Sequence, residues 1–161
     1  MPQTSYSLDP ATVVPGQVID AGDDTHIEPF IAAEVIAPGL GVELTSDGKG
    51  VQLPQGTGTG ISAFAGFAVF KDAREPGSYA IGDIVPVLRK GRIAANCVGS
   101  TTITALGAAN VSHSSTLATD RGKITSAATS GTAGSEVASV GAIFRKDPGV
   151  TNVAIIEVNL P

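Results

Sequence analysis

Residues 84–98 read Ile-Val-Pro-Val-Leu-Arg-Lys-Gly-Arg-Ile-Ala-Ala-Asn-Cys-Val, and this stretch sets the expected fold class. Aliphatic residues, several of them β-branched, fill both halves, as is typical of strands. Lys90-Gly91 predicts a turn between two strands, 84–88 and 92–98. Pro86 lacks the N–H group that a β-ladder uses, so the first of these strands is expected at a sheet edge or at a bulge.

Short apolar runs bounded by Gly, Pro, Asp and Ser continue on both sides of this stretch. Residues 41–45 and 51–53 flank Asp47-Gly48, where glycine can supply the positive φ of a hairpin turn. Residues 152–160 are apolar on both faces, which predicts a central strand. Further strand candidates are residues 33–36 and 61–70.

Helices are hard to place in this sequence. The alanine-rich stretches 105–111 and 126–138 are interrupted by glycine and are otherwise rich in Ser and Thr, so at most one short helix is expected. The expected fold is all-β: a small β-sandwich or barrel, jelly-roll-like or β-tulip-like.

A faint internal repeat accompanies this pattern. Gly48 and Gly66 recur as Gly122 and Gly141, at offsets of 74 and 75 residues. Gly66 and Gly141 each open an apolar run that ends in Lys-Asp. Two related β-units would explain the repeat. Chance recurrence of common turn residues is the alternative.

Composition excludes several classes of protein. The single cysteine, Cys97, rules out an intramolecular disulfide and a cysteine-based zinc cluster, and it is expected to be a small buried hydrophobe. A net charge of -5 and 4% aromatic residues disfavour nucleic-acid binding. The sequence begins without a signal-peptide pattern and has no apolar run long enough for a membrane span, so synthesis in a cytoplasm is expected.

Three local patterns invite a chemical interpretation. His26 lies among acidic residues, Ser112, His113 and Asp120 could be drawn as a hydrolase triad, and residues 56–60 alternate Gly and Thr like a phosphate loop. The first lacks a second histidine-rich segment, the second lacks a nucleophile elbow, and the third lacks the Lys-Ser/Thr that follows a Walker loop. Neither an enzyme nor a cofactor is expected.

Charge is unevenly distributed along the chain. Residues 1–48 contain eight acidic and no basic residues, whereas residues 49–161 contain seven acidic and ten basic residues. Prolines interrupt the acidic part, so an extended acidic N-terminal arm is expected over residues 1–32 and a β-domain over residues 33–161. The arm could wrap on its own domain as a solvated segment, or lie across a neighbouring subunit. Contact with a neighbour would involve Asp9, Asp20, Asp23, Asp24, Glu28 and Phe30.

Residues 74–93 combine a tyrosine just before Gly-Asp, a short apolar strand, a glycine turn and a second strand. With Ala65-Gly66-Phe67-Ala68 and Val140-Gly141-Ala142, this stretch resembles the capsid decoration, or structural cement, proteins of tailed bacteriophages, over about residues 35–160. The resemblance implies a small β-protein of the virion that lies on the outer capsid surface and bridges neighbouring major capsid proteins. It also implies a homodimer or homotrimer, and it transfers no catalytic residue.

A carbohydrate-binding or adhesion β-module, of a tail fibre or a surface layer, is the alternative function. Glycan recognition usually depends on exposed aromatic side chains, which are sparse here. Tyr6 and Tyr79 are the residues whose substitution would test that alternative.

Overall fold

Over the residues that it describes, the computed structural model is a β-protein, and the helix found among them is the single turn of 3-10 helix η1 (Ala118–Asp120). This confirms the expected all-β class, and the architecture is built around a closed barrel. The residues described are 13–20, 24–56, 61, 63–70, 77–99, 104–113, 118–127, 137–146 and 152–160.

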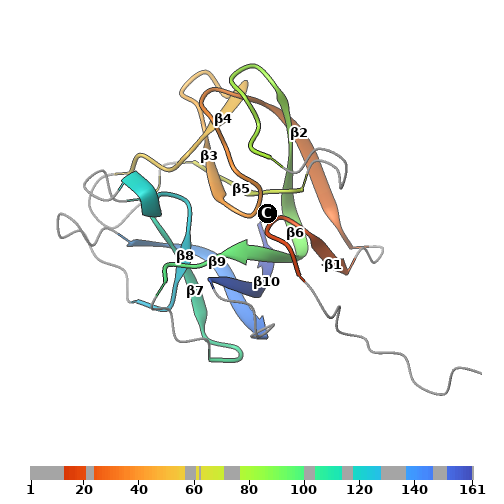
Figure 1. Cartoon of the computed structure of the whole chain (residues 1–161), viewed down its shortest axis with the longest axis vertical. Coiled ribbons are helices and arrows are strands. Elements are labelled where there is room, and N and C mark those ends of the chain that lie inside the picture. The colour runs from red at the N-terminus through yellow and green to blue at the C-terminus, as the bar shows by residue number, and fades with distance from the viewer. Residues whose placement is uncertain are drawn as a thin grey trace, which may run out of the picture.

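Five strands close the first ring. In order around the ring they are β2 (His26–Ala32), β4 (Gly50–Gln52), β3 (Gly41–Leu44), β5 (Phe64–Ala68) and β6 (Ile84–Asn96). Pairing of β2 with β6 completes the circuit, and the pairing of β2 with β4 is its only parallel one. Figure 1 shows this ring as the upper part of the molecule.

The second ring begins in the C-terminal half of β6. It continues through β10 (Val153–Asn159), β9 (Val137–Lys146), β7 (Ala108–Ser112) and β8 (Ile124–Thr125). A parallel bridge between Cys97 and Ile124, just beyond the end of β6, closes it. The second ring forms the lower part of the molecule (Figure 1).

The two rings have the same connectivity. β3 pairs with β4 and β5 as β7 pairs with β8 and β9, and the parallel pair Ala32 with Val51 corresponds to Cys97 with Ile124. The repeated glycines occupy matching places: Gly48 and Gly122 precede β4 and β8, and Gly66 and Gly141 lie at the bulged positions of β5 and β9. All four have positive φ, so the sequence repeat marks two related five-stranded units.

One strand serves both rings. β6 runs without interruption from Ile84 to Asn96, pairing first with β2 and then with β10. The turn expected at Lys90-Gly91 is therefore wrong. Gly91 instead has a φ of 128°, which allows the strand to bend where it passes from one ring to the other.

Pro86 lies inside this strand, paired on both sides, so the expectation of an edge or bulge is also wrong. Val69 N–H donates to the Pro86 carbonyl at 2.8 Å, but Pro86 has no N–H to return to the Val69 carbonyl. The Tyr79 hydroxyl donates to that carbonyl instead, at 2.6 Å. A side chain thus replaces the missing backbone donor, and burial with the nearby Asp83 charge raises the pKa of Tyr79 to about 12.

Several smaller expectations can be compared directly. The hairpin around Asp47-Gly48 and the central C-terminal strand are confirmed as β3–β4 and β10. Residues 33–36 do not form a strand, because β2 ends at Ala32 and Ile36 makes only an isolated bridge to Tyr79. η1 lies outside both alanine-rich stretches.

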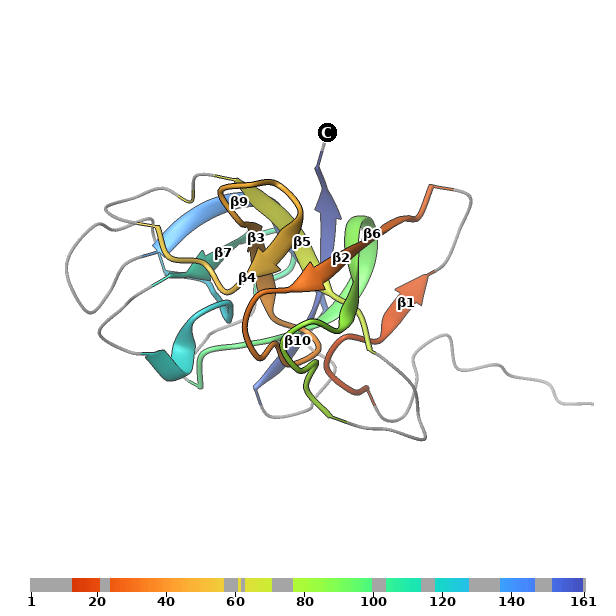
Figure 2. The same cartoon turned by 90° about the horizontal axis from the view of Figure 1, so that it is seen from above.

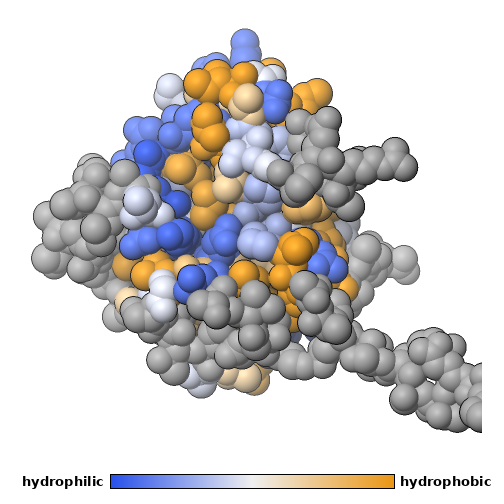
Figure 3. Space-filling model, in the orientation of Figure 1, coloured by the Kyte–Doolittle hydropathy of each residue, from blue (hydrophilic) through white to orange (hydrophobic). Residues whose placement is uncertain are grey.

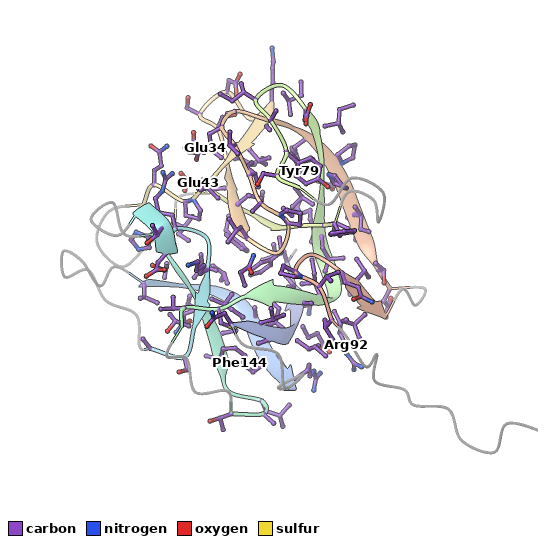
Figure 4. All side chains as sticks on the ribbon, in the orientation of Figure 1. Glu34, Glu43, Tyr79, Arg92 and Phe144 are labelled. Carbon is purple, nitrogen blue, oxygen red and sulfur yellow. The ribbon has the colours of Figure 1, made fainter. Side chains whose placement is uncertain are left out.

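Two cores fill the rings. Figure 4 labels Tyr79 in the first ring and Phe144 in the second, and both are fully buried. The first core is built mainly from small aliphatic residues around Tyr79. The second surrounds Phe144 and also includes Phe67 and Leu88, which β5 and β6 of the first ring contribute. Cys97 is 4% exposed in the second core, as expected.

The described part of the expected arm belongs to the sheet. β2 is a wall of the first ring, and Phe30 packs against its core. β1 (Val18–Asp20) pairs with β6 at Val18 and Asp20. Figure 2 shows β1 and β2 on the side of the molecule away from β7 and β9. Residues 26–32 are therefore part of the barrel rather than an extended arm, while residues 1–12 and 21–23 lie outside the described residues.

Candidate functional site

The outer face of the first ring carries a set of apolar side chains. On β2 and β6, residues alternate between the ring interior and the outside, so Ile31 and its cross-strand partner Ile84 both point outward. Pro29 and Pro86 form the next outward pair, and Ile27 follows on β2. We call this surface the open face; it also includes Val35, just after β2, and Ile81, just before β6.

Five of these side chains are well exposed: Ile27 by 43%, Ile31 by 52%, Val35 by 59%, Ile84 by 68% and Ile81 by 70%. A fully exposed aliphatic side chain corresponds to roughly 100 Å² of apolar surface at about 25 cal/mol per Å². At these exposed fractions the five side chains together present on the order of 300 Å². The largest apolar patch on a typical monomeric protein is about 300–600 Å² and is often functional.

The surroundings of the open face make it a shallow feature rather than a deep pocket. A hollow of about 660 Å³ borders it, lined by Ile31 and Ala33 and by residues of the β3–β4 turn such as Asp47 and Lys49. Figure 3 shows apolar surface around the upper end of the molecule, where the first ring lies. A broad and open surface of this kind suits a macromolecular partner better than a small substrate.

The sequence identified this face only partly. Ile27 and Ile31 stand out as apolar residues in an acidic stretch, but their grouping with Ile81 and Ile84 depends on the long-range pairing of β2 with β6. The sequence did carry a local signal around Ile84: in a strand, Ile84 must point to the opposite side from Val85, and Val85 and Val87 point inward.

The acidic residues expected to contact a neighbour have partners within their own chain where the structure describes them. Asp24 lies 3.5 Å from Lys90, and Glu28 lies 3.1 Å from Arg89 and 2.8 Å from His26. Hydrogen bonds from His26 and Arg89 lower the pKa of Glu28. The pairs with Lys90 and Arg89 join the acidic N-terminal part of the sequence to the basic C-terminal part.

Of the other expected contact residues, Phe30 is half-buried against the first core. Asp20 lies at the end of β1, opposite Arg92 in the sheet. Asp9 and Asp23 lie outside the described residues.

A second group of charges lies where β6, β9 and β10 meet. Glu157 accepts hydrogen bonds from Arg145 and Arg92, which lower its pKa, with nitrogen–oxygen distances of 2.8 and 3.0 Å. Lys90 and Arg92 line a neighbouring polar hollow of about 300 Å³ together with Asp24 and Glu157. Figure 4 labels Arg92 on this side of the second ring.

The seam between the rings is also polar. Arg121, in the turn before β8, reaches Glu34 at 3.1 Å and donates to the carbonyl oxygens of Leu53 and Pro54. Glu34 in turn accepts from Leu53 N–H at 2.6 Å. This network fixes the second ring against the first.

The residues drawn as a triad have separate partners. His113 is fully buried and bonds through Nδ1 to the Gly56 carbonyl, whereas Asp120 pairs with Lys123. Among the residues that the structure describes, no three His, Cys, Asp or Glu side chains group as metal ligands.

Aromatic residues offer little for glycan binding in the described chain. Tyr79 is fully buried and its hydroxyl is bound to Val69, so it cannot stack on a sugar ring. Tyr6 lies outside the described residues. No helix in the described chain has the length and hydropathy to cross a membrane.

Comparison with known proteins places the chain among phage proteins. Residues 1–159 match the family described as "Structural cement protein (E217 gp24/Pam3 gp6)". A chain of the solved structure "The capsid of Myoviridae Phage XM1" has the same fold: the TM-score is 0.73 and the identity 15%, over 98% of this chain and 94% of that chain. No curated protein matches the sequence.

The family match covers nearly the whole chain, including the first strands, and it confirms the resemblance seen around residues 74–93. The structural match has low identity and shows the shared fold alone. The chain belongs to the family of phage structural cement proteins.

Proposed function

We propose that this protein binds the outer surface of the assembled capsid and bridges neighbouring major capsid subunits, so that the shell resists rupture. A structural role in the capsid follows from the family. The observation that carries the finer proposal is the open face, a broad apolar surface on a chain whose described charges are largely paired internally.

The energy available at this face fits a bridging protein present in many copies. Covering about 300 Å² of aliphatic surface yields roughly 7 kcal/mol. That gain is comparable to the cost of association, about 4–15 kcal/mol, so one contact alone binds weakly. Additional contacts to an adjacent subunit convert weak affinity into avidity.

We further propose that the acidic N-terminal residues Asp9, Asp20 and Asp23 add a charged contact to the shell. We also propose that the protein associates with itself as a dimer or trimer. The concentration of acidic residues before Lys49 supports the first proposal. A charged contact weakens with added salt, whereas an apolar contact does not. Removing residues 1–12 should reduce only the salt-dependent part of binding.

The test uses the purified protein and expanded capsids of its own phage that lack it. We expect the protein to co-sediment with the capsids and to raise the temperature at which they rupture. Bovine serum albumin at the same concentration is the control. Absence of co-sedimentation together with an unchanged rupture temperature would rule out the proposed function.

A further inference from the structure

The open face of the first ring has a counterpart on the second ring. The pairing of Pro29 with Pro86 lies three residues before Ala32, and the pairing of Ala94 with Ile155 lies three residues before Cys97, which occupies the corresponding bridge position. By the same register, Ile84 corresponds to Val153.

The counterpart is covered by the chain itself. Val13 and Ile19 pack on Ala94 and Val153, which are 0% and 5% exposed. Residues 13–20 therefore form an extended strap across the outer face of the second ring. Ile84, which corresponds to Val153, is 68% exposed, and no described segment crosses the first ring in the same way.

The strap is held partly by backbone hydrogen bonds. Gly16 N–H donates to the Ala94 carbonyl at 2.7 Å, and Ala94 N–H donates to the Gln17 carbonyl at 2.9 Å. Pro29 stands at the position of Ala94 in the first ring and has no N–H. A segment lying on the open face cannot make the same pair of bonds, so side-chain packing must hold it.

The area of the open face also limits which partner can occupy it. Its aliphatic surface, on the order of 300 Å², is well below the roughly 800 Å² per partner that a standard stable interface buries. A second copy bound through this face alone would not form a stable dimer. A shell that presents the same partner segment many times needs no such area, because the contacts act together.

We propose that an extended, apolar and uncharged segment of a major capsid subunit lies across the open face, in the position that the strap occupies on the second ring, and binds through side chains rather than by strand pairing. This inference rests on the proposed function. It makes Ile31, Ile81 and Ile84 the principal contact residues.

The experiment measures co-sedimentation of full-length variants with expanded capsids. Ile31→Thr/Ile84→Thr keeps β-branched side chains but makes the face polar, and we expect its binding to weaken at least tenfold. Leu106→Asn is the matched control, because Leu106 is 66% exposed on the second ring and its φ of 65° suits asparagine. Its binding should stay within twofold of the wild type. Pro29→Ala, which places a backbone N–H on the open face, tests strand pairing and should not strengthen binding.

Each other outcome has a defined meaning. Absence of wild-type binding would rule out the proposed function. Equal binding of the wild type and the double variant would rule out only this inference. A gain in binding by Pro29→Ala would show strand pairing and overturn the side-chain mode. If sedimentation velocity without capsids shows that the double variant loses an oligomer formed by the wild type, the occupant is a second copy and the inference is wrong. Ile81→Thr, in a turn outside the strands, repeats the test should the double variant fail to fold.

Discussion

The two rings have the same strand connectivity but differ in what their outer faces meet. On the second ring, Val13 and Ile19 of the strap cover Ala94 and Val153. On the first ring, the corresponding face exposes Ile31 and Ile84. One β-unit can therefore have its outer face covered by a segment of its own chain or leave that face exposed.

The rings also differ in the backbone hydrogen-bond donors of the strand next to the bulged one, which is β6 in the first ring and β10 in the second. In the second ring, Ile155 has a backbone N–H, whereas its counterpart Pro86 in the first ring has none and depends on Tyr79. The first ring therefore uses a side-chain hydrogen bond at a position where the second ring has a backbone donor.

Deleting residues 1–30 should abolish cooperative unfolding, because it removes β1 and most of β2 and leaves the first ring open. Deleting residues 1–12 keeps every described residue and should leave the unfolding temperature nearly unchanged. Thermal denaturation followed by circular dichroism distinguishes the two. A normal transition in the longer deletion would show that closure of the first ring is dispensable.

The two bulge glycines should respond differently to alanine. A Cβ at Gly66 would lie 2.2 Å from the Leu88 carbonyl oxygen, whereas a Cβ at Gly141 meets nothing within 4 Å. We expect Gly66→Ala to lower the free energy of unfolding by about 3 kcal/mol or more, from steric overlap in the packed ring. Gly141→Ala should cost only about 1–2 kcal/mol, because it retains the positive-φ strain alone. Urea denaturation measures both, and equal losses would contradict the difference in packing.

Tyr79→Phe should lower the free energy of unfolding by about 1–3 kcal/mol, because it leaves the Val69 carbonyl without a donor. Adding Pro86→Ile supplies a backbone N–H at that position, as Ile155 does in the second ring, and should recover part of the loss. A double-mutant cycle gives the coupling between the two sites. Strict additivity of the two changes would refute the replacement of a backbone donor by the hydroxyl.

Stability should also decrease in strong alkali. Burial raises the pKa of Tyr79 to about 12 from its ordinary 10, so the unfolded chain ionises first. The stabilisation is complete below pH 10 and is lost as the pH rises through about 12. Denaturant midpoints measured across this range should fall in the wild type and fall less in Tyr79→Phe; identical slopes would exclude Tyr79 as the titrating group.

The smallest effect concerns the second ring. Hydrogen bonds from Arg145 and Arg92 lower the pKa of Glu157, so its contribution is present above the ordinary value of 4.5 and is lost as the pH falls below it. Since the group is partly exposed, we expect Glu157→Gln to change stability at neutral pH by no more than about 1 kcal/mol. The variant should flatten the acid limb of the stability profile, and an unaltered limb would assign acid sensitivity to other carboxylates.

Local chemistry alone determined much of this protein. Glycine, proline and aspartate bounded short aliphatic runs closely enough to predict an all-β chain, the Asp47-Gly48 hairpin and the central C-terminal strand. The repeat of Gly48 and Gly66 as Gly122 and Gly141 recorded the two units, because each position requires a positive φ that other residues resist.

Tertiary structure decided the rest, because pairing between distant strands sets which local preferences are expressed. Lys90-Gly91 became a bend rather than a turn once β2 and β10 paired with successive halves of β6. Pro86 is tolerated in a paired strand because the Tyr79 hydroxyl, from a separate segment, donates to the Val69 carbonyl. The acidic stretch became a barrel wall because β2 pairs with β4 and β6 and packs Phe30 against the core. Its carboxylates meet Arg89, Lys90 and Arg121 across the fold, and the pairing leaves Ile31 and Ile84 side by side on the outside.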